Sequence, residues 1–377
     1  MVRDLREIFP ITKRYVYLNH AGYSPPPKPV LEAVKEHLDK LQREILDLSV
    51  MESVREEVAK FIGATRDEIA LIPNTTLGLN IVANALPVKK GDNIVISDME
   101  FPSNVLPWLS LQQKGVEIRY AKSVNGLLHV DAYEKVIDDS TLAVSISYVT
   151  FINGFRHDVR AIADIAHSHG AFLIIDGIQA LGAIKVDVKL DDIDFLSCGG
   201  AKWLLSPFGT GFLYVKRELI DELEPPLPGW ANMDPLIYEK GLREGFDFSN
   251  LKWAKGSRRF DSGTLSFASF IGLREALRLL NKIGMDNIEK RILKLTGEIV
   301  EELMNLNVEV TTPREERHRA GIVHFLIKNP TIMTKTLLEN KIIVAVRNRG
   351  VRVSPHFYNT EEELEKFLSI IKKYLKS

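Results

Sequence analysis

The chain has 377 residues, and its 49 basic and 50 acidic side chains give a formal net charge of −1. This balance gives no electrostatic case for binding nucleic acid or an anionic membrane surface, so we expect small-molecule partners. The single cysteine excludes an intramolecular disulfide and a cysteine-rich metal site, and it points to a reducing compartment. No segment has the roughly 18 apolar residues of a membrane span, and the N-terminus lacks an apolar signal-peptide region. We therefore expect a cytoplasmic protein.

Apolar runs of strand length alternate with helix-period segments over residues 69–215. This pattern predicts an α/β fold with a mostly parallel central sheet flanked by helices. One helix should begin at Asn74-Thr75-Thr76. Asp158 suits the N-cap of another, and Gly170 suits the position just after its end. The predicted strands are residues 68–73, 93–99, 142–149, 171–176, 194–198 and 211–215.

The remaining sequence predicts a second, smaller unit. Residues 230–258 are polar, aromatic and irregular, which indicates a domain boundary or an active-site flap. An amphipathic helix begins at Phe267, and a helical pattern over residues 361–376 ends the chain. We predict an N-terminal segment near the small domain and active site, a large cofactor-binding α/β domain and a small C-terminal α+β domain, spanning residues 1–19, 20–256 and 257–377.

Chemically useful side chains follow the predicted strands, at the sheet edge where parallel α/β folds bind ligands. Thr75 and Thr76 place hydroxyls at a helix start, which suits a phosphate. A carboxylate after an apolar strand, such as Asp176, stays ionised only beside a cation, for example a protonated pyridine nitrogen. A lysine in a dry cleft, such as Lys202, becomes an amine that can form a Schiff base. With the flat ring of Phe101, these groups predict pyridoxal phosphate as the cofactor.

Each of these residues also has a simpler explanation. The threonines could only cap a helix, Asp176 could cap the following turn, Lys202 could be a surface lysine and Phe101 a core residue. Their joint placement after strands favours the cofactor site, and the chain has no phosphate-loop motif. We predict no metal site, because His167 and His169 at a helix C-terminus are expected to interact with the helix dipole.

The segment from Ser147 to Val215 contains HGAFLIIDGIQALGAIKVDV and DFLSCGGAKWLLSPFGTGFLYV. It resembles the class V aminotransferase family of fold-type I pyridoxal-phosphate enzymes. That family includes cysteine desulfurases, kynureninases and isopenicillin N epimerase-like proteins. Further blocks extend the likeness over nearly the whole chain: YLNHAG, NTTLGLNIVAN, SDMEFPSNVLPW, RRFDSGTLSFASFIGL and VRVSPHFYNTEEE.

The resemblance assigns roles to the cofactor-binding residues. It implies that Lys202 is the Schiff-base lysine and that Asp176 is the partner of the pyridine nitrogen. Gln179 would bond to the ring hydroxyl oxygen, and Thr75 and Thr76 would hold the phosphate.

The resemblance also implies contacts with a second subunit and with the substrate. Thr264 matches a threonine that family dimers donate to the phosphate of the neighbouring subunit, so we expect a homodimer with shared sites. Phe101 stands at the position of a residue stacked on the cofactor ring. Asn19 and His20 match a segment that lies close to the bound substrate, which we expect to be an amino acid.

The chain departs from the family pattern in several places. Gly199 and Ala201 stand where many members have Ser-x-His phosphate contacts, and Phe151 stands where many have asparagine. The loop AVRNRGVRV lacks the mobile thiol with which cysteine desulfurases attack the sulfur of their substrate. Cys198, the only thiol, reads as a small buried hydrophobe. We therefore expect that the protein is not a cysteine desulfurase.

The expected reaction follows from these assignments. Arg352 matches the arginine that binds the α-carboxylate of the substrate, for which a planar fork is suited, and Arg347 and Arg349 compete for this role. We expect a pyridoxal-phosphate-dependent aminotransferase that acts on an amino acid through a Schiff base at Lys202. An epimerase or a lyase of the isopenicillin N epimerase or kynureninase type stays open, as does a cofactor-binding regulatory protein without turnover.

Overall fold

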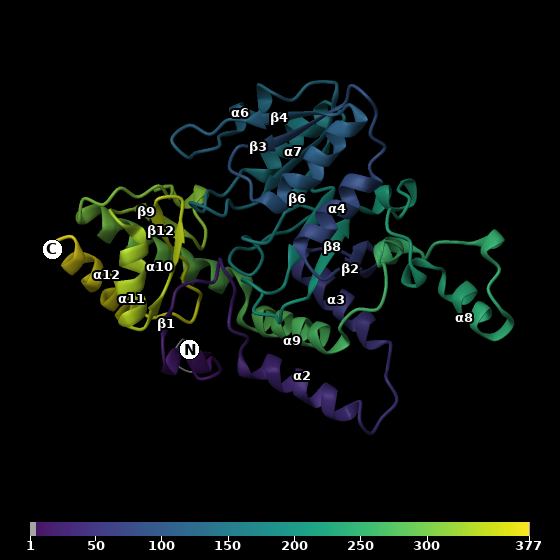
Figure 1. Cartoon of the computed structure of the whole chain (residues 1–377), viewed down its shortest axis with the longest axis horizontal. Helices are drawn as coiled ribbons and strands as arrows, with labels where there is room; N and C mark the ends of the chain where they lie inside the picture. Colours follow the sequence, from purple (N-terminus) through teal and green to yellow (C-terminus); the bar gives the residue numbers. More distant parts are fainter. Residues whose placement is uncertain (1–4, 377) are drawn as a thin grey trace.

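The computed structural model describes residues 5–376, and its largest sheet has seven strands in the order β2-β8-β7-β6-β5-β3-β4 (Figure 1). Strand β8 runs antiparallel to both of its neighbours, and the other pairs are parallel. The predicted mostly parallel α/β fold is therefore confirmed. The strands are β2 (Ile69–Leu71), β3 (Asn93–Ser97), β4 (Glu117–Ala121), β5 (Thr141–Ser147), β6 (Phe172–Asp176), β7 (Phe195–Gly199) and β8 (Gly211–Val215).

Helices cover both faces of this sheet, which is why its central strands are apolar on both sides. Ile94 and Ile96 of β3 cluster with Leu79 on one face, whereas Val95 belongs to the cluster of Ile162 on the other. The helices of this part are α2 (Lys28–Lys40), α3 (Val50–Ile62), α4 (Thr75–Ala85), α5 (Leu106–Leu109), α6 (Val130–Glu134), α7 (Val159–Ser168) and α9 (Phe267–Ile283).

Local side chains set the ends of two helices. Asp158 accepts a hydrogen bond from the N–H of Ala161 at 3.2 Å at the start of α7, and Gly170 has a φ of 72° just past its end. Both caps were predicted. At the start of α4, Asn74 accepts from the N–H of Leu77 at 2.9 Å. Since Asn74 supplies this cap, the threonine hydroxyls that follow it are not needed for capping.

The C-terminal part forms a three-stranded antiparallel sheet in the order β11-β12-β9. Strand β1 (Val16–Tyr17) pairs in parallel with β10 (Ile342–Ile343), so the N-terminal segment lies against this part. Helix α9 packs instead on α2 and α3. The predicted domain boundaries stay predictions. The elements are β9 (Val323–Leu326), β11 (Ala345–Arg347), β12 (Gly350–Val353), α10 (Met285–Asn305), α11 (Pro330–Glu339) and α12 (Glu361–Tyr374).

Two elements differ from the sequence expectations. Strand β4 was not expected, because its sequence EIRYA is partly polar, as suits an edge strand that pairs with β3 alone. Helix α8 (Pro235–Glu244) lies in a segment predicted to be irregular and projects from the body in Figure 1. Its start has local signals, because Asp234 accepts from the N–H of Leu236 at 2.9 Å and Pro235 occupies the first turn.

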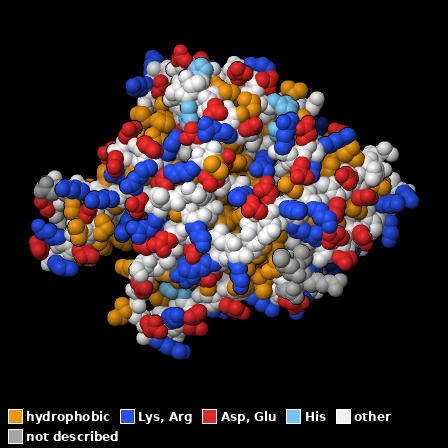
Figure 2. Space-filling model, turned by 180° about the vertical axis from the view of Figure 1, so that it is seen from behind, with side chains coloured by type: hydrophobic (Ala, Val, Ile, Leu, Met, Phe, Trp, Pro, Cys, Tyr) orange, Lys and Arg blue, Asp and Glu red, His pale blue; other side chains and the backbone are white. Residues whose placement is uncertain are grey.

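The surface carries both signs of charge. Figure 2 shows basic and acidic side chains interspersed over one face of the molecule, in keeping with the net charge of −1. Within residues 5–376, no helix has the length and apolar character needed to cross a membrane.

Candidate active site

A cavity of about 340 Å³ lies at the carboxyl ends of β6 and β7, beside the start of α4. Its volume is within the range of small-molecule pockets. Parallel strands end at one sheet edge, so residues far apart in the sequence meet there. Most of the predicted site residues line the cavity: Thr75, Thr76, Phe101, Asp176, Gln179, Lys202 and Arg352.

The first turn of α4 forms one end of the cavity. The buried hydroxyl of Thr75 accepts a hydrogen bond from the N–H of Gly199 at 2.9 Å, and the hydroxyl of Thr76 lies 2.8 Å from that of Ser103. A Cβ at Gly199 would come within 3.0 Å of Ile178 and 3.3 Å of Thr75. The glycine thus lets β7 approach α4. Hydroxyls and the unpaired N–H groups of a helix start are suited to a phosphate.

Asp176 ends β6 and is 1% exposed. Its Oδ1 accepts a hydrogen bond from the N–H of Ile178 at 3.0 Å, so it does cap the following turn. Burial raises the pKa of Asp176 to about 7, although this hydrogen bond and the nearby Lys202 oppose the rise. Asp176 forms no ion pair within residues 5–376. A cation beside this carboxylate would restore its ionised form.

Lys202 lies in the turn after β7, with its Nζ 5.8 Å from the centre of the Phe101 ring. Burial lowers the pKa of Lys202 to about 8; Arg352 and Arg347 act in the same direction, and Asp176 opposes them. In the part of the chain that the structure describes, this ammonium has no ion pair. An amine with this pKa is partly neutral near pH 7 and can act as a nucleophile.

Gln179 is held from both ends of its amide. Trp203 Nε1 donates to Gln179 Oε1 at 2.9 Å, and Gln179 Nε2 donates to the carbonyl of Ala21 at 3.1 Å. Because an amide nitrogen carries two hydrogens, one remains for a ligand in the cavity. The same bonds tie the residue after Lys202 to the N-terminal segment.

Arg352, on β12, is 1% exposed and reaches the cavity from the C-terminal part. Its Nη1 donates to the carbonyl of Phe151 at 2.7 Å, whereas Nε and Nη2 have no partner among the described residues. Burial and the neighbouring Arg347 lower the pKa of Arg352. Buried guanidinium hydrogens without acceptors favour an anionic ligand such as a carboxylate. Arg347 also lines the cavity, but Arg349 does not.

Asn19, His20 and Thr264 do not line the cavity of this chain. The ring of His20 is buried, with its nitrogens 2.6 Å from the hydroxyl of Ser24 and 3.0 Å from that of Tyr358. The two residues after His20 do reach the cavity. Thr264 is exposed to solvent. The roles of these residues stay predictions.

Some cavity residues were not singled out from the sequence. Ser103 lies shortly after Phe101 and follows the same strand-end rule, so it could have been found. Phe208 and Thr210 precede β8 instead of following a strand. They reach the cavity because β8 is antiparallel, which places its beginning at this edge of the sheet. The direction of a strand cannot be read from its apolar run alone.

Cys198 is 1% exposed and does not line the cavity. Its Sγ lies 3.4 Å from the carbonyl oxygen of Gly199, and burial raises the pKa of this thiol well above its ordinary value. A thiol in this environment is a poor nucleophile and is not reached from solution.

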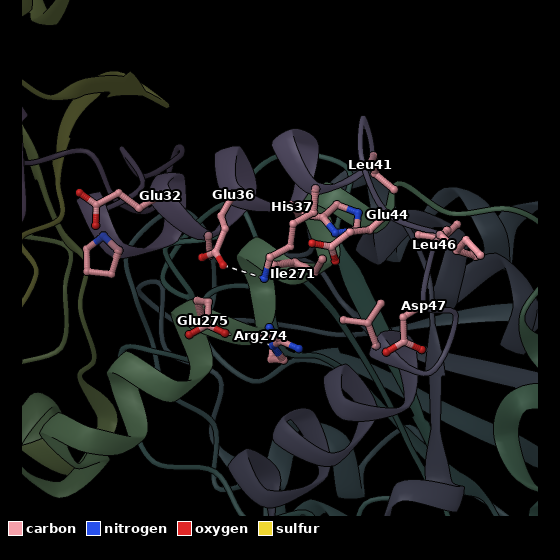
Figure 3. Close-up of a pocket in the computed structure, with 15 residues that line it drawn as sticks. Glu32, Glu36, His37, Leu41, Glu44, Leu46, Asp47, Ile271, Arg274 and Glu275 are labelled. Carbon is pink, nitrogen blue, oxygen red and sulfur yellow. Dashed lines mark hydrogen bonds and ion pairs between the residues drawn. The ribbon is translucent and has the colours of Figure 1, made fainter.

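A larger cavity of about 570 Å³ lies between α2, the loop after it and α9 (Figure 3). Four of its charged side chains form ion pairs with each other, Glu36 with Lys40 at 2.7 Å and Arg274 with Glu275 at 3.0 Å. None of the predicted site residues lines it. The candidate active site is therefore the smaller cavity.

The residues of the smaller cavity fit pyridoxal phosphate. The start of α4 suits its phosphate, the buried Asp176 carboxylate suits its protonated ring nitrogen, and Gln179 has a donor for its ring oxygen. Lys202 has the lowered pKa that a Schiff-base lysine needs. The Nε and Nη2 of Arg352 remain without partners among the described residues and are suited to a further anionic group.

Comparison with known proteins agrees with this fit. The model of the family "Aminotransferase class-V" matches residues 16–367, and the chain belongs to this family. A probable cysteine desulfurase of Pyrococcus abyssi is 34% identical, covering 99% of this chain and 98% of the relative. Another, from Methanothermobacter thermautotrophicus, is 32% identical over 96% and 95%. The apo structure of the cysteine desulfurase of Thermococcus onnurineus has a TM-score of 0.91 at 31% identity, over 99% and 98%.

These findings confirm the resemblance and the predicted cofactor, pyridoxal phosphate. They contradict the predicted function. The expectation that the protein is not a cysteine desulfurase is wrong, because relatives that match nearly the whole chain carry that name. One relative, from Bacillus subtilis and 31% identical over 95% of this chain and 94% of the relative, is named an uncharacterized aminotransferase. The names together do not clearly support that reaction. The exclusion relied on the place of one thiol, but a sulfur acceptor need not belong to the same chain.

Proposed function

We propose that the chain is a pyridoxal-phosphate-dependent enzyme that breaks the Cβ–Sγ bond of cysteine or a closely related sulfur amino acid. The names of its relatives support this reaction class. The observation that carries the proposal is the meeting of Lys202, Asp176 and Arg352 in one cavity. Such a reaction needs a lysine for the cofactor, a carboxylate for its ring nitrogen and a guanidinium for the substrate.

Each residue has a distinct task in this proposal. Arg352 holds the α-carboxylate with its unpartnered N–H groups and so orients Cα. Lys202, with its pKa lowered by burial to about 8, takes the Cα proton and later returns it. Asp176 would hold a proton on the ring nitrogen of the cofactor, and Phe101 would offer its flat side chain to the ring. When bound, the cofactor supplies an electron sink for the pair left at Cα.

The sulfur acceptor in this proposal is a thiol from outside the chain. Cysteine and an acceptor RSH give alanine and RSSH: the Cβ–Sγ bond breaks, a sulfur–sulfur bond forms, and Cβ gains a proton. Cys198 is a poor candidate for RSH, because it is 1% exposed and its thiol pKa is raised by burial.

The test is incubation of the pyridoxal-phosphate-loaded protein with cysteine and dithiothreitol, followed by quantification of alanine and sulfide. We expect equal amounts of both products, loss of both in K202A, and their retention in C198A. Pyruvate in place of alanine would indicate elimination and would contradict the proposed transfer of sulfur to a thiol. So would conversion of the cofactor to its pyridoxamine form without sulfide, which would indicate transamination.

We also propose that the enzyme is a homodimer in which Thr264 completes the phosphate site of the partner. Thr264 is exposed and lies outside the cavity of its own chain. Phe208, a cavity residue that is 70% exposed, is an aromatic surface that a second copy could cover. Mixing K202A with T264A tests the arrangement, since a mixed dimer has one site with both residues. Recovery of activity on mixing supports it, and no recovery contradicts it.

A further inference from the structure

The cavity has an excess of positive charge on its substrate side. Among its lining residues, the charged ones are Asp176, Lys202, Arg347 and Arg352. Asp176 is engaged by the ring nitrogen in the proposed function, and Lys202 by the cofactor itself. Two guanidinium groups then face the substrate, although one α-carboxylate neutralises only one of them.

The β11–β12 hairpin places these two arginines on the same face of the small sheet. Ala345 opposes Arg352 in the antiparallel register, and Arg347 lies two residues after Ala345. Side chains alternate along a strand, so Arg347 and Arg352 point to the same side of the sheet. As diagonal neighbours they have Cα atoms about 7–8 Å apart. This separation lets them hold two anionic groups of one small molecule.

Arg347 has no acidic partner in residues 5–376. Its one side-chain hydrogen bond runs from Nη1 to the carbonyl of Val346 at 2.7 Å, which leaves most of its donors unused. No Asp or Glu of the described chain forms an ion pair with Arg347 or Arg352. Two like charges held close together in a partly buried site repel each other, and a ligand with two negative charges removes that cost.

We propose that Arg347 binds a second anionic group of the substrate, so that the site prefers sulfur amino acids whose side chain also carries an acid group. This inference rests on the proposed function for the role of Arg352, and it makes Arg347 a specificity-determining residue. A carboxylate or a sulfinate on a sulfur-containing side chain would satisfy the same planar fork.

The inference is tested by binding, without turnover. Calorimetric titration of the pyridoxal-phosphate-loaded protein with succinate, glutarate and adipate is compared with titration by butyrate, pentanoate and hexanoate. We expect the best dicarboxylate to bind about tenfold or more tightly than its monocarboxylate partner, as one charge-assisted hydrogen-bonded contact allows. The length of the best diacid reports the reach of the natural side chain.

Substitutions in the β11–β12 hairpin test whether Arg347 causes the preference for dicarboxylates. R347Q should reduce the preference to less than about threefold, and R347K, which keeps the charge, should retain part of it. R349Q is the matched control, because Arg349 is exposed and outside the cavity, and it should keep the full preference. Equal binding of mono- and dicarboxylates by the wild type, or an equal loss in R349Q, would overturn the inference. Neither result would alter the assay of alanine and sulfide, which tests the proposed function separately.

Discussion

Trp203, the residue after Lys202, donates its indole hydrogen to Gln179 Oε1 at 2.9 Å, and both side chains are at most 2% exposed. This bond joins the lysine turn to the turn that follows Asp176. Because the bond is buried, its loss leaves an unpaired acceptor. We predict that W203F destabilises the protein by about 1–3 kcal/mol through this acceptor, in addition to the lost packing.

The packing contribution of Trp203 can be separated from the hydrogen bond by a double-mutant cycle with Q179L in urea denaturation. A coupling near zero would show that the bond contributes nothing. W253F is the matched control, since Trp253 also donates from its indole, to Glu224 at 2.6 Å, but does so in an exposed position. We expect a cost below about 1 kcal/mol there, because water replaces the lost partner.

The pKa of Lys202 predicts how the cofactor loads. Only the neutral amine attacks the aldehyde, and burial lowers the pKa of Lys202 to about 8 from an ordinary value of 10.5. The rate of pyridoxal phosphate incorporation into cofactor-free protein should therefore rise with pH and level off above about pH 8. It is followed by the visible absorbance of the Schiff base, which K202R should lack. A midpoint near 10.5 would show that the amine is not desolvated.

The buried carboxylate of Asp176 predicts a pH dependence of stability in the cofactor-free protein. Burial raises the pKa of Asp176 from 3.8 to about 7, so between these values the folded state binds more protons than the unfolded state. Stability should therefore fall as pH rises through this window, by up to about 1.4 kcal/mol per pH unit. D176N removes the titrating group and should flatten the slope in urea denaturation between pH 5 and 7.

Cofactor binding should remove this pH dependence between pH 5 and 7, because a protonated ring nitrogen keeps the Asp176 carboxylate ionised in the folded state. The loaded wild type should hence lack the downward slope of the cofactor-free protein in this window, since Asp176 is then ionised in both the folded and the unfolded state. Identical pH slopes for the two cofactor-free proteins would contradict the burial of an ionisable Asp176.

A buried ion pair supports the segment that leads to Thr264. Arg55 of α3 pairs with Asp261, whose Oδ1 also accepts from the N–H of Leu71 at 2.9 Å. R55M leaves a buried carboxylate without its cation and should cost about 3–5 kcal/mol in urea denaturation. R66Q is the control: Arg66 is 49% exposed in its ion pairs, and its loss should cost less than about 1 kcal/mol. Equal costs would refute the role of burial.

The sequence was informative where residue type and strand position act together. The strand-end rule located Thr75, Asp176 and Lys202, because all three follow strands that run in the same direction to one edge. It failed at Phe208, which precedes the antiparallel strand β8. Helix α8 was also not predicted, because its capping residues stand among aromatic and polar residues.

The sequence by itself determined the α/β fold, the family and the cofactor, because apolar periodicity, strand-end chemistry and family blocks are properties of contiguous residues. The reaction class was misjudged from the sequence, since the place of one thiol does not limit which thiol accepts sulfur. Only the tertiary structure shows which residues share the cavity. It leaves two nitrogens of Arg352 without partners and places Arg347 in the same cavity. Burial and charge pairing arise from contacts between distant segments, and these form only when the chain is folded.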